Sequence, residues 1–252
     1  QGNSHINAVG NSLNNVLVGN AGNNELAGGL GTDTLKGASG NDTYRVDLVR
    51  NGESSSVILE DIVIEQFNEG IDTVELLIRD DYSYDFATTA GNLTLGNHLE
   101  NLDASDTQSL LINLLGNNLA NELTGNDANN LIAGGLGNDV LTGGAGSDIF
   151  RVDTKLNELN NIDVITDFLS GIDKIQLENA IFKNLTYTGS LKEVNFFKGA
   201  DFVPQGATNY ILYDESNGGV YYDVDGTGVN SATQFLTLLG VPNLSASDFI
   251  VE

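Results

Sequence analysis

Apolar positions along this chain come in short, separate clusters between turn-forming residues, and they do not follow the spacing of a helix. Residues 10–45 divide into four nine-residue units, and residues 116–151 divide into four more. Because glycine and asparagine favour tight turns, about six residues of each unit can turn and about three can form a short strand. Position 8 is always apolar or aromatic: Leu17, Leu26, Leu35, Tyr44, Leu123, Ile132, Leu141 and Phe150. The pattern predicts stacked coils around a column of buried side chains.

The two sets of units are a duplication. Gly10 falls on Gly116 and Asp47 on Asp153, at one constant offset of 106 residues. Position 1 is always Gly, and position 2 is Gly, Asn or Ala, from which we expect a tight turn with positive φ. Position 6 always carries a side-chain oxygen: Asn15, Asn24, Asp33, Asp42, Asn121, Asn130, Asp139 and Asp148. Stacking the units would place these oxygens in rows.

The residues outside the units also carry strand signals. Residues 48–115 contain VILEDIVIEQF, GIDTVELLI and SLLINLL, which are β-branched and alternating or fully apolar. The stretch LEDIVIEQFNEGIDTVEL resembles NIDVITDFLSGIDKIQL after the second set of units, with residues 70–72 (GID) matching 171–173. The full unit is therefore a roll plus a strand-rich segment, repeated once and followed by a different ending. Residues 154–252 hold most of the aromatic side chains, which suits a cap over the last hydrophobic layer of a repeat stack. We expect an all-β chain with four parts: 1–47, 48–115, 116–153 and 154–252.

The charge balance changes this picture. Lys and Arg total 10 against 35 Asp and Glu, so the formal net charge is -25. Nucleic-acid binding needs a basic surface, and an anionic membrane would repel this chain. Self-repulsion opposes compaction unless a bound cation neutralises it. An acidic surface that only keeps the protein soluble is the alternative, whereas 40% hydrophobic residues argue against a disordered acidic tail. No apolar run reaches the roughly 20 residues of a membrane helix.

Sequence motifs for catalysis are missing. His5 and His98 are the only histidines, and neither lies in an H-E-x-x-H motif. No G-x-S-x-G elbow, P-loop or dinucleotide fingerprint occurs, and the absence of cysteine excludes disulfides and thiol chemistry. Pairs of carboxylates arise by chance among 35 acids and identify nothing. We therefore expect that the chain is not itself an enzyme.

The units resemble the glycine-rich nonapeptide G-G-x-G-x-D-x-U-x of RTX (hemolysin-type calcium-binding) proteins. Residues 28–36 (GGLGTDTLK), 134–142 (GGLGNDVLT) and 143–151 (GGAGSDIFR) match every constrained position, and residues 37–45 (GASGNDTYR) depart only at Ala38. The resemblance implies an all-β fold of two parallel β-roll blocks joined by the strand-rich segment, with a β-rich capping region at the C-terminal end. Two units would form one coil, with calcium between equivalent turns of successive coils.

The resemblance also implies the ligands. Calcium would bind the position-6 side chains and turn carbonyls, with Asp33 beside Asn15, Asp42 beside Asn24, Asp139 beside Asn121, and Asp148 beside Asn130. The Asn positions either form weaker sites, because an amide lacks the carboxylate charge, or only hydrogen-bond the turns as a ladder. The turn glycines that would contribute carbonyls are Gly28, Gly29, Gly31, Gly37, Gly40, Gly134, Gly135, Gly137, Gly143, Gly144 and Gly146.

Other acids leave two interpretations open. Residues 223–228 (DVDGTG) read as a hairpin turn or as a further calcium loop, although an EF-hand loop would need Gly and Glu at positions where neither stands. Asp163, Asp167 and Asp173 are either peripheral ligands or strand-end caps.

Residues 154–252 resemble the C-terminal region of type I-secreted RTX proteins, through DVITDFLSGIDKIQL, NYILYDESNGGVYYDVDGTG and ATQFLTLLGVPNLSASDFIVE. The resemblance implies an uncleaved export signal near the C-terminus. Residues 248–251 fit it, and Glu252 is less usual. The chain opens at Gln1 without a basic-then-apolar leader, so we expect a piece of a longer protein.

The expected partners are calcium ions and the type I secretion apparatus, and the expected location is outside a Gram-negative-type bacterium, secreted or at its surface. The leading hypothesis is a calcium-folded structural module. The alternatives are an accessory module of a secreted protease, lipase or alginate-modifying enzyme, which could also bind polysaccharide, and the end of a surface adhesin.

Overall fold

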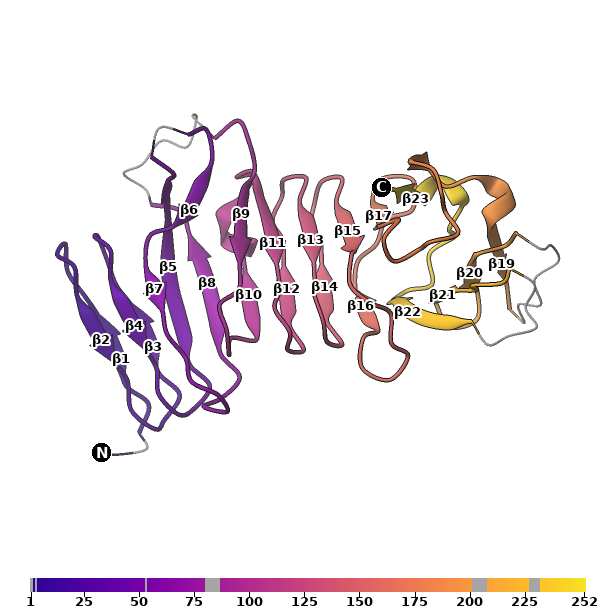
Figure 1. Ribbon diagram of the computed structural model, residues 1–252. Coiled ribbons are helices and arrows are strands. Elements are labelled where there is room, and N and C mark those ends of the chain that lie inside the picture. The colour runs from indigo at the N-terminus through magenta and orange to yellow at the C-terminus, as the bar shows by residue number, and fades with distance from the viewer. Residues whose placement is uncertain (1, 3, 53, 80–86, 201–207, 227–231) are drawn as a thin grey trace.

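The computed structural model describes residues 2, 4–52, 54–79, 87–200, 208–226 and 232–252, and these form an elongated roll of stacked strands with a cap at its C-terminal end (Figure 1). A 13-stranded sheet runs along one side of the roll. In spatial order its strands are β1 (Asn7–Val9), β3 (Glu25–Ala27), β5 (Thr43–Arg50), β8 (Thr73–Leu77), β10 (Asn101–Asp103), β12 (Glu122–Thr124), β14 (Val140–Thr142), β16 (Asp163–Ile165), β22 (Thr233–Leu238), β21 (Gly219–Tyr222), β20 (Ile211–Asp214) and β19 (Phe196–Gly199), with β6 (Val57–Leu59) paired to β5.

Two further sheets contain the remaining strands of the described residues. The first has three strands, β2 (Val16–Val18), β4 (Thr34–Lys36) and β7 (Ile62–Val63). The second has seven, β9 (Gly91–Thr94), β11 (Ile112–Leu115), β13 (Leu131–Ala133), β15 (Ile149–Val152), β17 (Lys174–Leu177), β23 (Phe249–Val251) and β18 (Gly189–Ser190). Three short 3₁₀ helices, η1 (Ser105–Thr107), η2 (Glu193–Asn195) and η3 (Ala246–Asp248), complete the assigned elements, and none of them could cross a membrane.

The register confirms the parallel roll. Glu25 pairs with Thr43 and Glu122 with Val140, so equivalent residues lie two nine-residue units apart, as expected for one coil. The strand-rich joining segment extends the same sheet, because β5 pairs in parallel with β8 and β8 with β10. Its coils are longer, since Thr43 pairs with Thr73. The four-part division of the chain stays a prediction, and the sheet runs on through 48–115.

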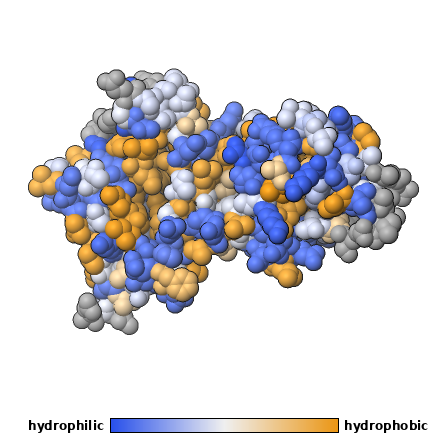
Figure 2. All heavy atoms as spheres, viewed as in Figure 1, coloured by the Kyte–Doolittle hydropathy of each residue, from blue (hydrophilic) through white to orange (hydrophobic). Residues whose placement is uncertain are grey.

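The predicted column of position-8 side chains forms the core of the roll. Leu26, Leu35, Tyr44, Leu123 and Ile132 are fully buried, and Leu141 and Phe150 are 1% exposed. Leu17, in the first coil, is only half-buried. Figure 2 shows apolar residues at the surface of this N-terminal end, where Val9, Leu13, Val16 and Val18 are exposed.

The C-terminal segment caps the roll by extending both of its sides. Strand β22 pairs in parallel with β16, and β23 pairs in parallel with β17. Beyond them β20, β21 and β22 form an antiparallel meander. The Phe182 ring packs against Tyr222 and Phe235, with both centroid distances 5.1 Å. These aromatic residues cover the end of the core, as expected for a cap.

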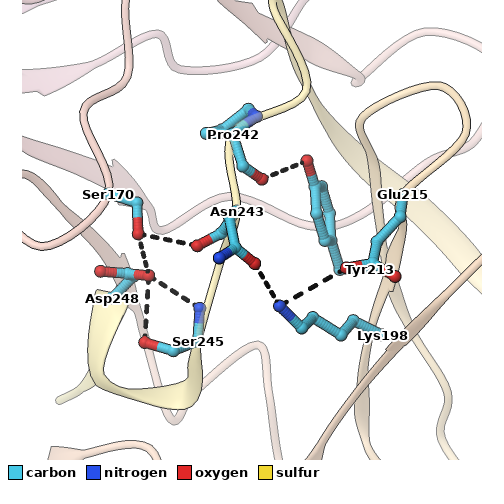
Figure 3. Close-up of polar contacts among 8 residues, drawn as sticks. All are labelled: Ser170, Lys198, Tyr213, Glu215, Pro242, Asn243, Ser245 and Asp248. Atoms are coloured by element: carbon cyan, nitrogen blue, oxygen red, sulfur yellow. Dashed lines mark hydrogen bonds and ion pairs between the residues drawn. The ribbon is translucent and has the colours of Figure 1, made fainter.

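Polar contacts tie the chain end to this cap (Figure 3). The Asp248 carboxylate accepts hydrogen bonds from the Ser170 hydroxyl (2.9 Å) and the Ser245 amide (2.8 Å). The Tyr213 hydroxyl donates to the Pro242 carbonyl (2.7 Å), and Lys198 contacts the Asn243 side chain. Asp248 is fully buried, so the C-terminal strand is an integral part of the cap.

Candidate metal centres

The position-6 side chains lie directly before strands and form a hydrogen-bonded ladder along the roll. In each predicted pair, one carboxylate oxygen (Oδ1) of the Asp accepts from the backbone N–H of the Asn one coil earlier. These distances are 2.6 Å for Asp33 with Asn15 and for Asp42 with Asn24, and 2.8 Å for Asp139 with Asn121 and for Asp148 with Asn130. The structure therefore brings together each of the four pairs.

The second carboxylate oxygen explains why position 1 is glycine. A Cβ placed on Gly28 or Gly134 would collide with Oδ2 of Asp33 or Asp139, respectively. Neither glycine has positive φ, so the positive φ expected in these turns does not fall at position 1, where the requirement is for space. Positive φ occurs instead at positions 2 and 4 of the units that match the nonapeptide, at Gly29, Gly31, Gly40, Gly135, Gly137, Gly144 and Gly146, and at Ala38, where a side chain is strained.

The turn carbonyls also lie close to the preceding coil. The carbonyl oxygens of Gly28 and Gly134 face Gly10 and Gly116, respectively. Gly37 and Gly143 have the same relation to the units before them. A role for these carbonyls as ligands stays a prediction.

Several buried carboxylate oxygens in these turns have no hydrogen-bond partner. Among the described residues they include Oδ2 of Asp33, Asp42 and Asp139, whose residues are at most 1% exposed. A buried, unpaired carboxylate is strongly unfavourable unless a cation or a proton neutralises it. Hard oxygen ligands of this kind suit Ca²⁺, which takes 6–8 oxygens at flexible geometry. The donor set therefore fits calcium.

The same burial raises the pKa values of the turn carboxylates. Burial raises the pKa of Asp139 to about 6. Burial, together with the charges of Asp173 and Asp167, raises the pKa of Asp148 to about 6, and burial raises the pKa of Asp42. Each shift means that the folded protein without a cation disfavours the ionised carboxylate.

The Asn positions are satisfied differently. Oδ1 of Asn121 accepts from the Asn117 N–H (2.8 Å), and its amide group donates to the Glu100 carbonyl (3.1 Å). Asn130 likewise accepts from the Asn126 N–H (2.9 Å) and donates to a carbonyl one coil earlier. In the first block, Asn15 and Asn24 accept from the N–H of their own position-2 residues. These contacts favour the hydrogen-bonded ladder over the weak calcium site.

Four acids outside the predicted set extend the ladder. The backbone N–H groups of Asp33, Asp42, Asp139 and Asp148 donate to acids one coil later, over 2.9, 2.7, 3.1 and 3.0 Å. The acceptors are Asp61, Asp72, Asp163 and Asp173. Each acid lies one residue before a strand or at its first residue, in the stretches DIV, DTV, DVI and DKI. Asp163 and Asp173 were among the acids with two open interpretations, and the same placement could have identified Asp61 and Asp72.

The pKa values of three of these added acids are also raised. Burial, followed by the charge of Asp139, raises the pKa of Asp163 to about 8. Burial also raises the pKa of Asp61 to about 6 and that of Asp72 to about 7, with neighbouring carboxylates adding to both shifts. Asp167 differs, because its two oxygens accept the Gly143 and Gly144 N–H groups at 2.9 and 2.8 Å. It acts as a turn cap.

The remaining candidate residues lie in turns or at the surface. Asp223 accepts from the N–H groups of Asp225 and Gly226, both at 3.1 Å, as in a turn closed by its own side chain. The rest of the stretch, 227–231, lies outside the described residues. His5 is exposed and contacts the Asn23 carbonyl, and His98 has positive φ and lies beside Phe67.

Two protein-family models match the chain. The RTX calcium-binding nonapeptide repeat, in four copies, matches residues 9–44. The peptidase M10 serralysin C-terminal model matches residues 98–251, which include the second block and the cap. No protein in the comparison with curated proteins matches significantly. The match supports calcium as the ion of the repeat turns, and the chain belongs to the serralysin C-terminal family of RTX calcium-binding proteins.

Proposed function

We propose that this chain is a calcium-dependent folding module of a secreted protein, and that it folds when it meets calcium outside the cell. The observation that carries the proposal is the row of buried carboxylate oxygens without partners in the repeat turns. A cation bound to them would provide the missing partner and offset part of the net charge of -25.

The ligands we assign are the ladder carboxylates Asp33 with Asp61, Asp42 with Asp72, and Asp139 with Asp163. Asp148 continues the ladder, but both oxygens of its neighbour Asp173 accept backbone N–H groups, from Asp148 and Leu169. Calcium is scarce in the cytoplasm, so repulsion among these acids would keep the chain unfolded and exportable. Extracellular calcium modules bind with Kd of about 10⁻⁴–10⁻³ M. At about 10 mM calcium each site that binds only the folded state then adds about 1.4–2.7 kcal/mol of stability.

The experiment is urea unfolding of this chain, followed by circular dichroism, in calcium and after chelation. We expect a strong β signal and a high urea midpoint in calcium, and loss of both after chelation. Magnesium at equal concentration is the control, because Mg²⁺ keeps several waters and suits a buried all-protein site poorly. An unchanged midpoint after chelation would contradict the proposal.

We further propose that the C-terminal segment carries the export signal. Strand β23 lies between β17 and β18, and Phe249 and Val251 are fully buried. A secretion apparatus would have to bind this segment before the roll folds. Export of a reporter fused to residues 154–252 tests the signal, and failure of export with a complete apparatus would contradict it.

A second candidate places the module beside a secreted enzyme. The family description names a peptidase, which favours a protease as the protein that carries this C-terminal region. The roll would then support folding of that enzyme and would not itself catalyse a reaction. The sequence upstream of residue 1 tests this, since a zinc protease motif there would support it. A glycan array tests the remaining alternative of polysaccharide binding.

A further inference from the structure

The side of the roll opposite the 13-stranded sheet is divided between two sheets that do not pair with each other. Strand β7 is the last strand of the three-stranded sheet, and β9 is the last strand of the seven-stranded sheet. On the other side of the roll β5, β8 and β10 pair without interruption. The coils therefore separate on one side only, and in Figure 1 β2 and β4 are inclined to β11 and β13.

An apolar cavity of about 230 Å³ is lined by residues of β7 and β9. We call this opening, between residues 59–63 and 93–99, the seam. The side chains that form its inner surface are at most 4% exposed, and they are Val74, Leu93, Leu95, Leu99 and Leu102. Because an apolar cavity of about 150 Å³ already binds benzene, the seam has room for a side chain the size of Leu or Phe.

The edge of β7 at the seam has unused backbone groups. The N–H groups of Ile62 and Ile64 donate to β4, both at 2.9 Å. Since the N–H and C=O groups of successive residues in a strand point to opposite sides, those of Val63 point away from β4. Among the described strands β7 pairs with β4 alone, so Val63 offers a donor and an acceptor at this edge.

The duplicated strand in the second block shows what fits on such an edge. Val63 is equivalent to Ile165, because Val63 pairs with Leu35 and Ile165 pairs with the matching Leu141. On its outer edge β16 pairs in parallel with β22, and the Leu239 N–H donates to the Ile165 carbonyl at 2.9 Å. In the first block no described strand takes the place of β22.

We propose that the seam binds an extended peptide segment of another protein, which adds to the free edge of β7 as a parallel strand. In the second block Leu238 pairs with Ile165 and is fully buried. An apolar peptide residue at the same place would point into the cavity beside Val63. Backbone hydrogen bonds would supply affinity, and the cavity would select apolar residues at alternate positions. This binding role goes beyond calcium-dependent folding and requires only the folded roll.

Charge restricts the peptide further. Asp61 is the only charged residue among the described residues that line the cavity, and the whole chain carries a net charge of -25. An acidic peptide would be repelled, whereas Lys or Arg beside the apolar residues would speed association. The expected ligand is therefore a segment with apolar residues at alternate positions and basic flanks.

Binding of a synthetic peptide tests the site. The probe copies residues 233–239 (TQFLTLL), carries lysines at both ends and a fluorescent label, and is titrated with the whole chain in calcium. Fluorescence anisotropy should show saturable binding. The same peptide with Leu238→Asp should bind at least about tenfold more weakly, because a carboxylate in the apolar cavity would lack a partner. Absence of saturable binding, or equal binding of the two peptides, would overturn the inference.

A proline in the protein locates the bound peptide. Val63→Pro removes the N–H at the seam without removing a bond to β4, and strand edges tolerate proline. Val18→Pro is the matched control at the far edge of the same sheet, where the Gly19 N–H donates to β4 and the Val18 N–H points outward. We expect Val63→Pro to weaken peptide binding at least about tenfold and Val18→Pro to leave it unchanged. Equal peptide affinity of the two variants would contradict the placement.

Further measurements keep the test decisive. Circular dichroism in calcium checks that each variant folds. If Val63→Pro does not fold, Thr94→Arg replaces it, because Thr94 is exposed at the cavity and the added bulk and charge should also weaken binding of the basic peptide. Binding of benzene without binding of the peptide would make the cavity a small-molecule site and would overturn the inference. Self-association in light scattering that Val63→Pro abolishes would also overturn it, since a second copy would then be the occupant.

Discussion

At the scale of single residues, the glycine at position 1 of each repeat is required because a Cβ does not fit there. In the units with Asp at position 6, position 1 is glycine because the Oδ2 atom of that Asp occupies the place where a Cβ would stand; in the Asn units the Asn Oδ1 and a glycine carbonyl of the next coil occupy it. Gly134 and Asp139 illustrate this, since the backbone of Gly134 is of an ordinary kind that any residue could adopt. The glycine at position 1 therefore depends on the acid at position 6, and turn propensity alone does not explain why either residue is there.

We expect Gly134→Ala to destabilise the calcium-loaded protein by about 1–3 kcal/mol, because the added methyl group must displace the Asp139 carboxylate. Urea unfolding in calcium measures this, and the calcium concentration at half-folding should rise. Gly199→Ala is the control, since a Cβ there meets only ordinary contacts with Phe197. It should change stability by less than about 0.5 kcal/mol. Equal effects of the two substitutions would contradict the spatial argument.

At the scale of elements, the last turn is held to the roll by one carboxylate. Burial would raise the pKa of Asp248, but N–H groups of Ser245 and Gly171 and the hydroxyls of Ser170 and Ser245 outweigh it and hold that pKa below its usual range. Asp248 forms a capping box with Ser245 at the start of η3, immediately before β23. The cap thus depends on an ionised acid, in contrast to the turn acids.

We expect Asp248→Ala to cost at least about 2 kcal/mol, because two buried backbone donors lose their acceptor at about 1–3 kcal/mol each. Asp106→Ala is a matched control, since Asp106 is an exposed acid in another 3₁₀ helix, η1, without a side-chain cap. Thermal unfolding in calcium measures both. Similar melting temperatures for the two variants would show that the network does not hold the cap.

At the scale of the whole molecule, one column of acidic and amide side chains follows the side of the 13-stranded sheet. Asn24, Asp42, Asp72, Glu100, Asn121, Asp139 and Asp163 succeed one another along it. With a net charge of -25, the folded chain without cations brings like charges together in buried turns. Calcium and protons therefore compete to neutralise the same groups.

The calcium-free protein should become less stable as the pH rises. The pKa values of Asp61, Asp139 and Asp148 are raised to about 6, that of Asp72 to about 7 and that of Asp163 to about 8. A raised folded-state pKa contributes stability that is complete below the unfolded value, near 4, and is lost as the pH rises through the folded value.

Dialysed, calcium-free protein should therefore show its highest urea midpoint near pH 4, and the midpoint should fall until the folded state is lost as the pH rises toward about 8. In calcium the urea midpoint should instead rise with pH over the same range, because the ion binds the deprotonated carboxylates. The same pH profile with and without calcium would show that these acids do not bind the ion.

The sequence alone determined the local design, because each nonapeptide encodes its own turn, strand and inward side chain. The stacked turns, the buried column from Leu26 to Phe150 and the Asp positions follow from a period that needs no distant contact, whereas the parallel coil of two units was implied by the resemblance to RTX repeats. The aromatic composition of residues 154–252 predicted that a cap exists, but it did not predict how the strands of the cap pair.

Tertiary structure alone decided which acids meet. Residues Asp42, Glu65 and Asp72 belong to coils of unequal length, so spacing along the chain could not show that their oxygens converge. Packing between coils likewise decided three further features. These are the hydrogen bonds of the Asn side chains, the lack of room for a Cβ at Gly134, and the extension of the sheet through 48–115. Local pattern specifies a turn, but the neighbouring coil specifies what each oxygen contacts.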